Sequence, residues 1–223
     1  MRKMHHVVLA ALLVSGLGCA AERVIPPSRG VASNGAGDLT ELLLTHVDGM
    51  RRVYGPETGA FGGLRATRAG LHALGAARVD KPQCRSSGQL DARALAEAPG
   101  AVVSFATPSV GSSGPTRTVT QAVMVADWFP GTPPADCARY TATIGTETIA
   151  YVTTPVTAPG WGEDAQGFFT TAETGRLRTN IGSVVVKYRG VLMSLLVVGA
   201  NVTRADVIRQ ADLASENLRR VVV

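Results

Sequence analysis

The sequence is poor in the residue types that carry most enzyme chemistry. Aromatic residues make up 5% of its 223 residues, and it has four histidines and three cysteines. Only His46 and His72 lie beyond the N-terminal hydrophobic region. Neither belongs to an HExxH pattern or to another spacing that brings two ligands to one side of a helix. The sequence therefore predicts no metal site and no cofactor.

Motifs for nucleotide binding and acyl transfer are also missing. No GxxxxGK[ST] loop is present, and no GxGxxG follows a predicted strand. The segment GSSG at 111–114 is one residue shorter than GxSxG, the motif that exposes a nucleophilic serine on a strand-to-helix turn. A hydrolase acting through Ser112 or Ser113 is therefore the least favoured function, and we expect that the protein is not an enzyme.

The charge balance does not favour a nucleic-acid partner. The chain has 22 basic and 17 acidic residues, and removal of Arg2 and Lys3 with a leader leaves 20 bases against 17 acids. The basic residues are dispersed, and no basic run alternates with aromatic residues. We therefore expect no binding to nucleic acid.

The N-terminus has the features of an export signal. A cationic start is followed by an apolar run from Val7 to Leu17 and then by Gly18-Cys19-Ala20-Ala21. Cys19 after a small residue is typical of a bacterial lipobox, whose thiol receives a diacylglycerol, although Gly16 stands where lipoboxes usually carry leucine. Lipidation at Cys19 would anchor the protein on the outer face of the cell membrane. The alternative is ordinary cleavage after Ala21, which would release a secreted protein.

Three regions follow from these patterns. Residues 1–21 form the signal and lipobox region, and residues 22–37 are rich in Pro, Ser and Gly, which predicts a flexible spacer. Residues 38–223 are enough for one sizeable hydrophobic core, so we expect a single domain.

The domain contains one pair of cysteines, Cys84 and Cys137. In an exported protein such a pair is expected to form a disulfide. The two residues lack CxxC spacing, so they indicate neither a zinc site nor a thioredoxin-like motif.

The stretch from Ile181 to Ala200 predicts a β-hairpin. Val184, Val186 and Tyr188 alternate with Val185, Lys187 and Arg189, which is the period of a strand with one solvated face. After a turn at Arg189 and Gly190, the segment from Val191 to Val198 is almost entirely apolar, which favours a position inside a sheet. Charges within the stretch come too early for a membrane span of roughly 20 apolar residues.

The C-terminal segment from Asn201 to Val223 predicts an amphipathic helix. Thr203 and Asp206 resemble a capping box at its start. The apolar positions recur every three or four residues and form one stripe: Val207, Ala211, Ala214, Leu218 and Val221. We expect this helix to cover one face of the sheet.

The remaining segments complete an α+β fold with a largely antiparallel sheet. We predict an N-terminal helix from Leu39 to about Val53, capped by Asp38. A second helix is predicted from Thr67 to Ala77, with Leu71 and Leu74 facing inward. Other expected elements are a short helix at Asp91–Ala98, strands at Ala101–Ala106, Arg117–Trp128, Glu147–Thr154 and Gly167–Ala172, and a short helix or turn at Cys137–Tyr140.

Two tryptophans on loops rich in proline and glycine offer a candidate binding surface. Trp128 lies in DWFPGTPP and Trp161 in APGWGED. A loop aromatic can anchor a ligand or a protein partner. The alternative is that each tryptophan covers the edge of the core.

The overall pattern resembles the small mycobacterial and actinobacterial lipoproteins of unknown function. The resemblance is carried by Cys19, the spacer, the two later cysteines and the ending GSVVVKYRGVLMSLLVVGA followed by NVTRADVIRQADLASENL. The last two strands and helix are also similar to the extracellular sensor domain of PknH-type kinases. That family has two disulfides and a WxxC element, whereas Trp161 here is followed by Gly, Glu and Asp.

This resemblance implies a binding or sensing role in the cell envelope and supplies no catalytic residue. We therefore expect a non-enzymatic, lipid-anchored domain that binds an envelope ligand or a protein partner. The alternative is a carrier of lipid or glycolipid, with the apolar hairpin lining a cavity.

Overall fold

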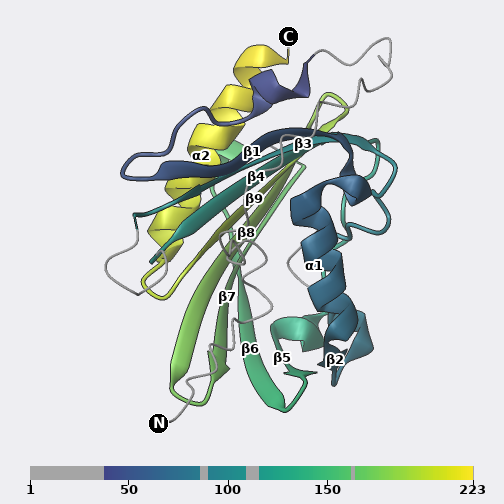
Figure 1. Cartoon of the computed structure of the whole chain (residues 1–223), viewed down its shortest axis with the longest axis vertical. Coiled ribbons are helices and arrows are strands. Elements are labelled where there is room, and N and C mark those ends of the chain that lie inside the picture. The colour runs from purple at the N-terminus through teal and green to yellow at the C-terminus, as the bar shows by residue number, and fades with distance from the viewer. Residues whose placement is uncertain (1–37, 86–89, 109–115, 162–163, 223) are drawn as a thin grey trace, which may run out of the picture.

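The computed structural model describes residues 38–85, 90–108, 116–161 and 164–222. This part of the chain forms one nine-stranded antiparallel sheet with two α-helices (Figure 1). The strands are β1 (Arg51–Ala60), β2 (Arg78–Val79), β3 (Pro99–Ala106), β4 (Thr118–Val125), β5 (Arg139–Ile144), β6 (Glu147–Val156), β7 (Ala165–Thr174), β8 (Leu177–Tyr188) and β9 (Val191–Gly199). The helices are α1 (Arg65–Ala76), α2 (Arg204–Val221) and the short 3₁₀ helices η1 (Leu39–Leu42), η2 (Phe61–Gly63), η3 (Pro82–Cys84), η4 (Ala135–Ala138) and η5 (Pro159–Trp161).

The predicted hairpin lies at the middle of the sheet. The strand order is β1-β3-β4-β9-β8-β7-β6-β5-β2, so β9 and β8 each have a neighbour on both sides. Arg189 and Gly190 form the turn between them with positive φ angles of 47° and 78°. Such a two-residue turn matches the twist of the flanking strands. The prediction of the hairpin and of its turn is confirmed, but the expected solvated face of the first strand is wrong, because every residue of β8 from Ile181 to Val186 is buried.

Helix α2 covers one face of the sheet, as predicted (Figure 1). Its capping box is present, with the Thr203 side chain accepting from the backbone of Asp206 and the Asp206 side chain accepting from Thr203. Four residues of the predicted stripe are fully buried: Val207, Ala211, Ala214 and Leu218. Close contact with the sheet is possible because Gly182 of β8 has no side chain to meet Val207.

Helix α1 lies on the opposite face of the sheet and packs far less tightly. Gly70 is the only fully buried residue of α1, and the inward-facing Leu71 and Leu74 are only partly buried. The turn before the helix docks more firmly, because Phe61 and Leu64 are buried in a cluster with Val102 of β3. The second predicted helix is therefore confirmed, but it stands over the sheet instead of sealing it.

The prediction of a long N-terminal helix is wrong after its first turn. Asp38 caps the segment as expected, but the helix ends at Leu42, and residues 51–60 form the edge strand β1. Gln121 of β4 explains the early end, because its amide accepts from the Leu44 N–H and donates to the Leu42 carbonyl. These tertiary hydrogen bonds replace the ones a longer helix would have made internally.

Two shorter predictions also differ from the structure. The segment 91–98 forms successive turns and no helix. Cys137 ends up in the 3₁₀ helix η4, and the chain continues at once into β5 from Arg139. Within the described residues, no helix has the length and apolar character needed to cross a membrane.

Candidate functional site

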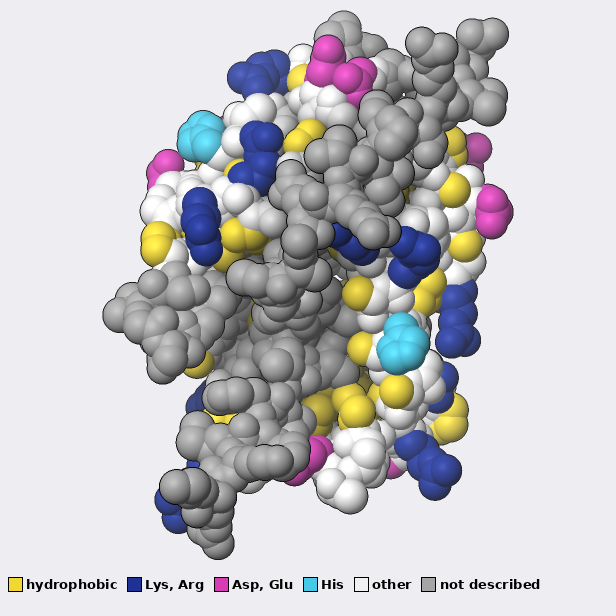
Figure 2. All heavy atoms as spheres, in the orientation of Figure 1, with side chains coloured by type: hydrophobic (Ala, Val, Ile, Leu, Met, Phe, Trp, Pro, Cys, Tyr) yellow, Lys and Arg dark blue, Asp and Glu magenta, His cyan; other side chains and the backbone are white. Residues whose placement is uncertain are grey.

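A groove of about 140 Å³ lies between α1 and the sheet. Figure 2 shows hydrophobic side chains along the side of α1 that is next to the sheet. The groove exists because α1 presents small residues and half-buried leucines to the sheet, so that it does not pack into it. Its described lining is Phe61, Ala66, Thr67, Gly70, Leu71, Leu74, Leu90, Ala92, Val102, Thr120, Ala122, Ser183, Ser194 and Leu196.

Three hydroxyl residues stand on the floor of this groove on neighbouring strands. Thr120 of β4 and Ser183 of β8 are both register partners of Leu196 on β9. Ser194 is two residues before Leu196 on the same face, so it is diagonal to both hydroxyl residues. Thr120 also hydrogen-bonds to Ser104 at 2.9 Å. The floor is thus apolar with a small polar centre.

The N-terminal end of α1 is held by backbone contacts of η2. The Phe61 N–H donates to the Ala98 carbonyl, and the Gly62 N–H donates to the Ala96 carbonyl, both at 2.8 Å. A side chain at Gly62 would lie 2.8 Å from the Cβ atom of Ala96, so the close approach needs glycine there.

The C-terminal end of α1 is held by a second anchor that includes the predicted disulfide. Cys84 and Cys137 are bonded and fully buried, which confirms their pairing. The Lys81 ammonium donates to the carbonyls of Asp136 and Arg139. Asp136 lies beside the two sulfurs, but sulfurs joined in a disulfide are not available as thiolate ligands for a metal. The disulfide therefore ties the segment that follows α1 to η4, directly before β5.

The two predicted tryptophans occupy different environments. Trp161 is buried in the core, and its indole N–H donates to the Asp212 carboxylate at 2.9 Å. Trp128 is 39% exposed. Their loops do approach each other, because Gln166 beside the Trp161 loop donates to the carbonyl of Pro130. A second hollow of about 260 Å³ lies there and is lined in part by Trp161 and Thr132.

The other residues singled out from the sequence lie apart from the groove or outside the described residues. His46 is exposed on the loop after η1, and His72 is exposed on α1. Cys19, which carries the lipidation prediction, and the serines of the GSSG segment fall among the residues that the structure does not describe. Two sequence features pointed towards the groove: the inward leucines of the second predicted helix and the apolar hairpin, which contributes Ser183, Ser194 and Leu196 to the lining.

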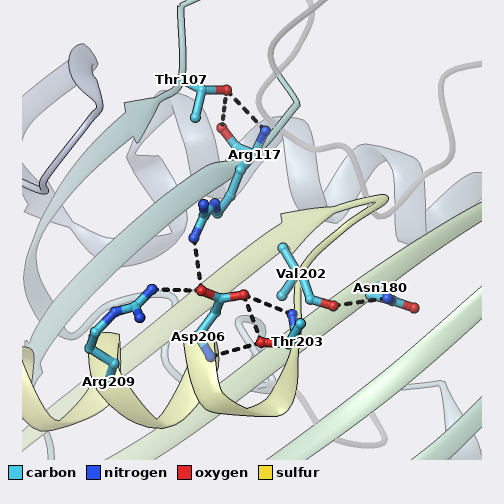
Figure 3. Close-up of polar contacts among 7 residues, drawn as sticks. All are labelled: Thr107, Arg117, Asn180, Val202, Thr203, Asp206 and Arg209. Carbon is cyan, nitrogen blue, oxygen red and sulfur yellow. Dashed lines mark hydrogen bonds and ion pairs between the residues drawn. The ribbon is translucent and has the colours of Figure 1, made fainter.

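A polar network fixes the start of α2 to the sheet (Figure 3). Asp206 accepts from the guanidinium of Arg117 at 3.0 Å and from that of Arg209 at 2.6 Å. Burial raises the pKa of the Asp206 carboxyl, but hydrogen bonds from Thr203 and the charge of Arg117 lower it more. The net result is a pKa below the usual value, so this carboxylate is charged at neutral pH and can pair with Arg117 and Arg209.

A stacked tyrosine pair stands on the part of the sheet near the second anchor. The rings of Tyr140 on β5 and Tyr151 on β6 are 4.8 Å apart and nearly parallel. Desolvation by burial raises the pKa of Tyr140 well above its ordinary value, and the neighbouring Tyr151 adds to the effect. Both phenols are therefore neutral near pH 7.

Solved structures give the fold a precedent. The extracellular domain of PknH from Mycobacterium tuberculosis aligns with a TM-score of 0.54 at 15% sequence identity, over 82% of this chain and 95% of that domain. This chain shares the fold of the PknH extracellular domain. A putative uncharacterised protein of Mycobacterium smegmatis, the Rv0999 ortholog, aligns with a TM-score of 0.38 at 12% identity, over 64% of this chain and 85% of that protein. No protein-family model and no curated protein matches the chain.

The likeness to the PknH extracellular domain confirms the similarity seen in the last two strands and helix. One disulfide accounts for both cysteines beyond residue 37, so this chain keeps the PknH-type fold with a single bridge.

Proposed function

We propose that this protein is a lipid-anchored domain of the cell envelope that binds a ligand without transforming it. The export signal, the lipobox-like Cys19 and a disulfide typical of oxidising compartments support a location outside the cytoplasm. The fold of an extracellular sensor domain supports a sensing role. The observation that carries the proposal is the apolar groove beneath α1, with its hydroxyl residues on the floor.

The anchor is tested by metabolic labelling with a fatty-acid probe. The wild-type protein is expected to carry the label in the membrane fraction, and Cys19→Ala is expected to lose it. An unlabelled wild type would show that the protein is released after ordinary cleavage and has no lipid anchor.

Ligand binding is tested by native mass spectrometry of the protein purified gently from its own envelope. We expect a bound species that disappears in Ala66→Trp, which places an indole in the groove. Ala69→Trp is the matched control, because Ala69 is an exposed residue of the same helix. A clean apo mass for the wild type, or equal loss in both variants, would contradict binding in this groove.

The groove does not favour the alternative of a lipid carrier. Its volume of about 140 Å³ is below the roughly 300 Å³ at which sites for drug-sized ligands begin. A whole glycolipid is larger still. We therefore propose either a small ligand or a larger ligand of which only one small group enters the groove.

A further inference from the structure

The lining of the groove also restricts the chemistry of what it binds, and this inference rests on the proposed function. None of its described lining residues is Lys, Arg, His, Asp or Glu. A charged group buried against such walls would lose its hydration without gaining a partner of opposite charge. The part of the ligand that contacts these described walls is therefore expected to be uncharged.

The floor supplies a defined polar contact within this apolar lining. Among the described residues Ser194 has no side-chain hydrogen-bond partner, and it is only partly buried. Thr67 faces the groove from α1 on the opposite wall. A hydroxyl both donates and accepts, so Ser194 suits a neutral alcohol, amide or ester group. A ligand without such a group would leave that hydroxyl less well solvated.

The volume sets the size of the buried part. A cavity of about 150 Å³ lined by Leu, Ile and Phe accommodates benzene, and the groove here is about 140 Å³. The walls contributed by Leu71, Leu74 and Leu196 are aliphatic. A ring or short chain of roughly six carbon atoms fits this space.

We propose that the groove recognises a neutral amphiphile, in which an aliphatic body of about six carbons lies between α1 and the sheet and one uncharged polar group hydrogen-bonds to Ser194. Such a ligand can be a free alcohol or the end of a longer envelope molecule. The two sources share this chemistry and differ in what extends beyond the groove.

The test uses three probes that share a cyclohexane ring and differ in charge at pH 7. They are neutral cyclohexanol, protonated cyclohexylamine and the anion cyclohexanecarboxylate. Binding to the full disulfide-bonded domain is followed by the methyl NMR resonances of Leu71, Leu74 and Leu196. Cyclohexanol is expected to shift these resonances with a dissociation constant at least about tenfold lower than that of either charged analogue. Equal or tighter binding of a charged analogue, or no shift with cyclohexanol, would overturn the proposed ligand class.

The role of Ser194 is tested by comparing cyclohexanol with methylcyclohexane. For each protein, the preference is the dissociation constant of methylcyclohexane divided by that of cyclohexanol. This ratio should be about tenfold higher in the wild type than in the Ser194→Ala variant. Thr143→Ala is the control, because Thr143 of β5 hydrogen-bonds to Thr148 and neither residue lines the groove. An unchanged preference in Ser194→Ala would exclude this serine as the polar contact.

The outcomes separate this inference from the proposed function. If the native protein carries an envelope ligand that is lost in Ala66→Trp but the groove prefers a charged probe, the binding function stands and the neutral class fails. A membrane lipid and a free small alcohol are distinguished by the mass of the species that accompanies the purified wild type.

Discussion

At the scale of single residues, Asp206 connects the start of α2 with the sheet. Its carboxylate accepts from the backbone and side chain of Thr203 and also pairs with Arg117 of the segment that leads into β4. Thr107 fixes the Arg117 backbone in turn, by accepting from its N–H at 3.1 Å (Figure 3). One side chain therefore serves both as a helix cap and as a tertiary contact.

Asp206→Asn should lower the free energy of unfolding by about 1 to 2 kcal/mol at pH 7, because the cap is weakened and the charge facing Arg117 is lost. The folded-state pKa of Asp206 is lower than its unfolded value. Its contribution is therefore complete above about pH 4 and disappears as the pH falls through the folded pKa. Urea unfolding at a series of pH values should show a shallower acid limb in the variant.

Arg209→Ala is the control for this prediction, because Arg209 contacts the same carboxylate from an exposed position. Its side chain is 60% exposed, whereas that of Asp206 is 15% exposed. An exposed ion pair contributes roughly 0 to 1 kcal/mol. A larger loss in Arg209→Ala than in Asp206→Asn would show that the surface pair, and not the cap, holds the helix.

Tyr140 gives a prediction at alkaline pH. Burial raises its folded-state pKa above the ordinary value of 10.0. Above about pH 10 the unfolded chain loses the phenol proton while the folded chain keeps it, so stability falls as the pH rises towards the folded pKa. Tyr140→Phe should reduce this slope in unfolding measured between about pH 9 and pH 11. An identical slope in the variant would show that Tyr140 titrates normally.

At the scale of elements, the sequence predicts best where local pattern and tertiary environment agree. The hairpin of β8 and β9 and the C-terminal helix carry their own period, turn and cap, so they could be predicted. The segment after Asp38 also has helical spacing, but Gln121 hydrogen-bonds to its backbone, and the 3₁₀ helix η1 ends at the buried Leu42. Nothing in the sequence of residues 39–53 indicates that Gln121 will hydrogen-bond to their backbone groups.

The contact between α2 and β8 depends on the absence of a side chain at Gly182. A Cβ atom there would lie 2.0 Å from a methyl group of Val207. Gly182→Ala should therefore destabilise the protein by about 1 to 3 kcal/mol, because the helix must move away from the sheet. Thermal unfolding measures the loss, and hydrogen exchange of α2 should become faster.

Gly63→Ala is the matched control for Gly182→Ala, since a Cβ atom at Gly63 meets no atom within 4 Å. Its effect on stability should stay within roughly 0.5 kcal/mol. If Gly182→Ala were equally mild, the sheet and the helix would be less closely fitted than their contacts indicate.

At the scale of the whole molecule, the α+β class and the cysteine pairing could be predicted, but the position and size of the groove could not. Its walls come from η2, α1, the segment with Leu90 and Ala92, β3, β4, β8 and β9. Its width depends on how far α1 stands from the sheet. The amphipathic pattern of α1 shows which side of the helix faces the sheet, but it does not show how closely the helix approaches the sheet. The hydroxyls of Ser183 and Ser194 become neighbours only through strand register.

The disulfide links two cysteines separated by 53 residues and ties the segment that follows α1 to η4. On the chain-entropy model, a loop of this length is expected to contribute about 4 kcal/mol. The Cys84→Ser, Cys137→Ser double variant should therefore unfold at a clearly lower urea concentration than the wild type. Reductant should lower the wild-type midpoint towards that of the variant and leave the variant unchanged.

The structure also predicts which elements lose protection from amide exchange first when the disulfide is removed. Helix α1 has one fully buried residue, whereas α2 has six. Loss of the Cys84–Cys137 disulfide should therefore increase amide exchange in α1 and β2. Under native conditions, β8, β9 and α2 should stay protected. The same variant should bind cyclohexanol more weakly, because the wall of the groove is no longer fixed. Uniform loss of protection across both helices would instead mean that the disulfide stabilises the domain as one unit and does not set the position of α1.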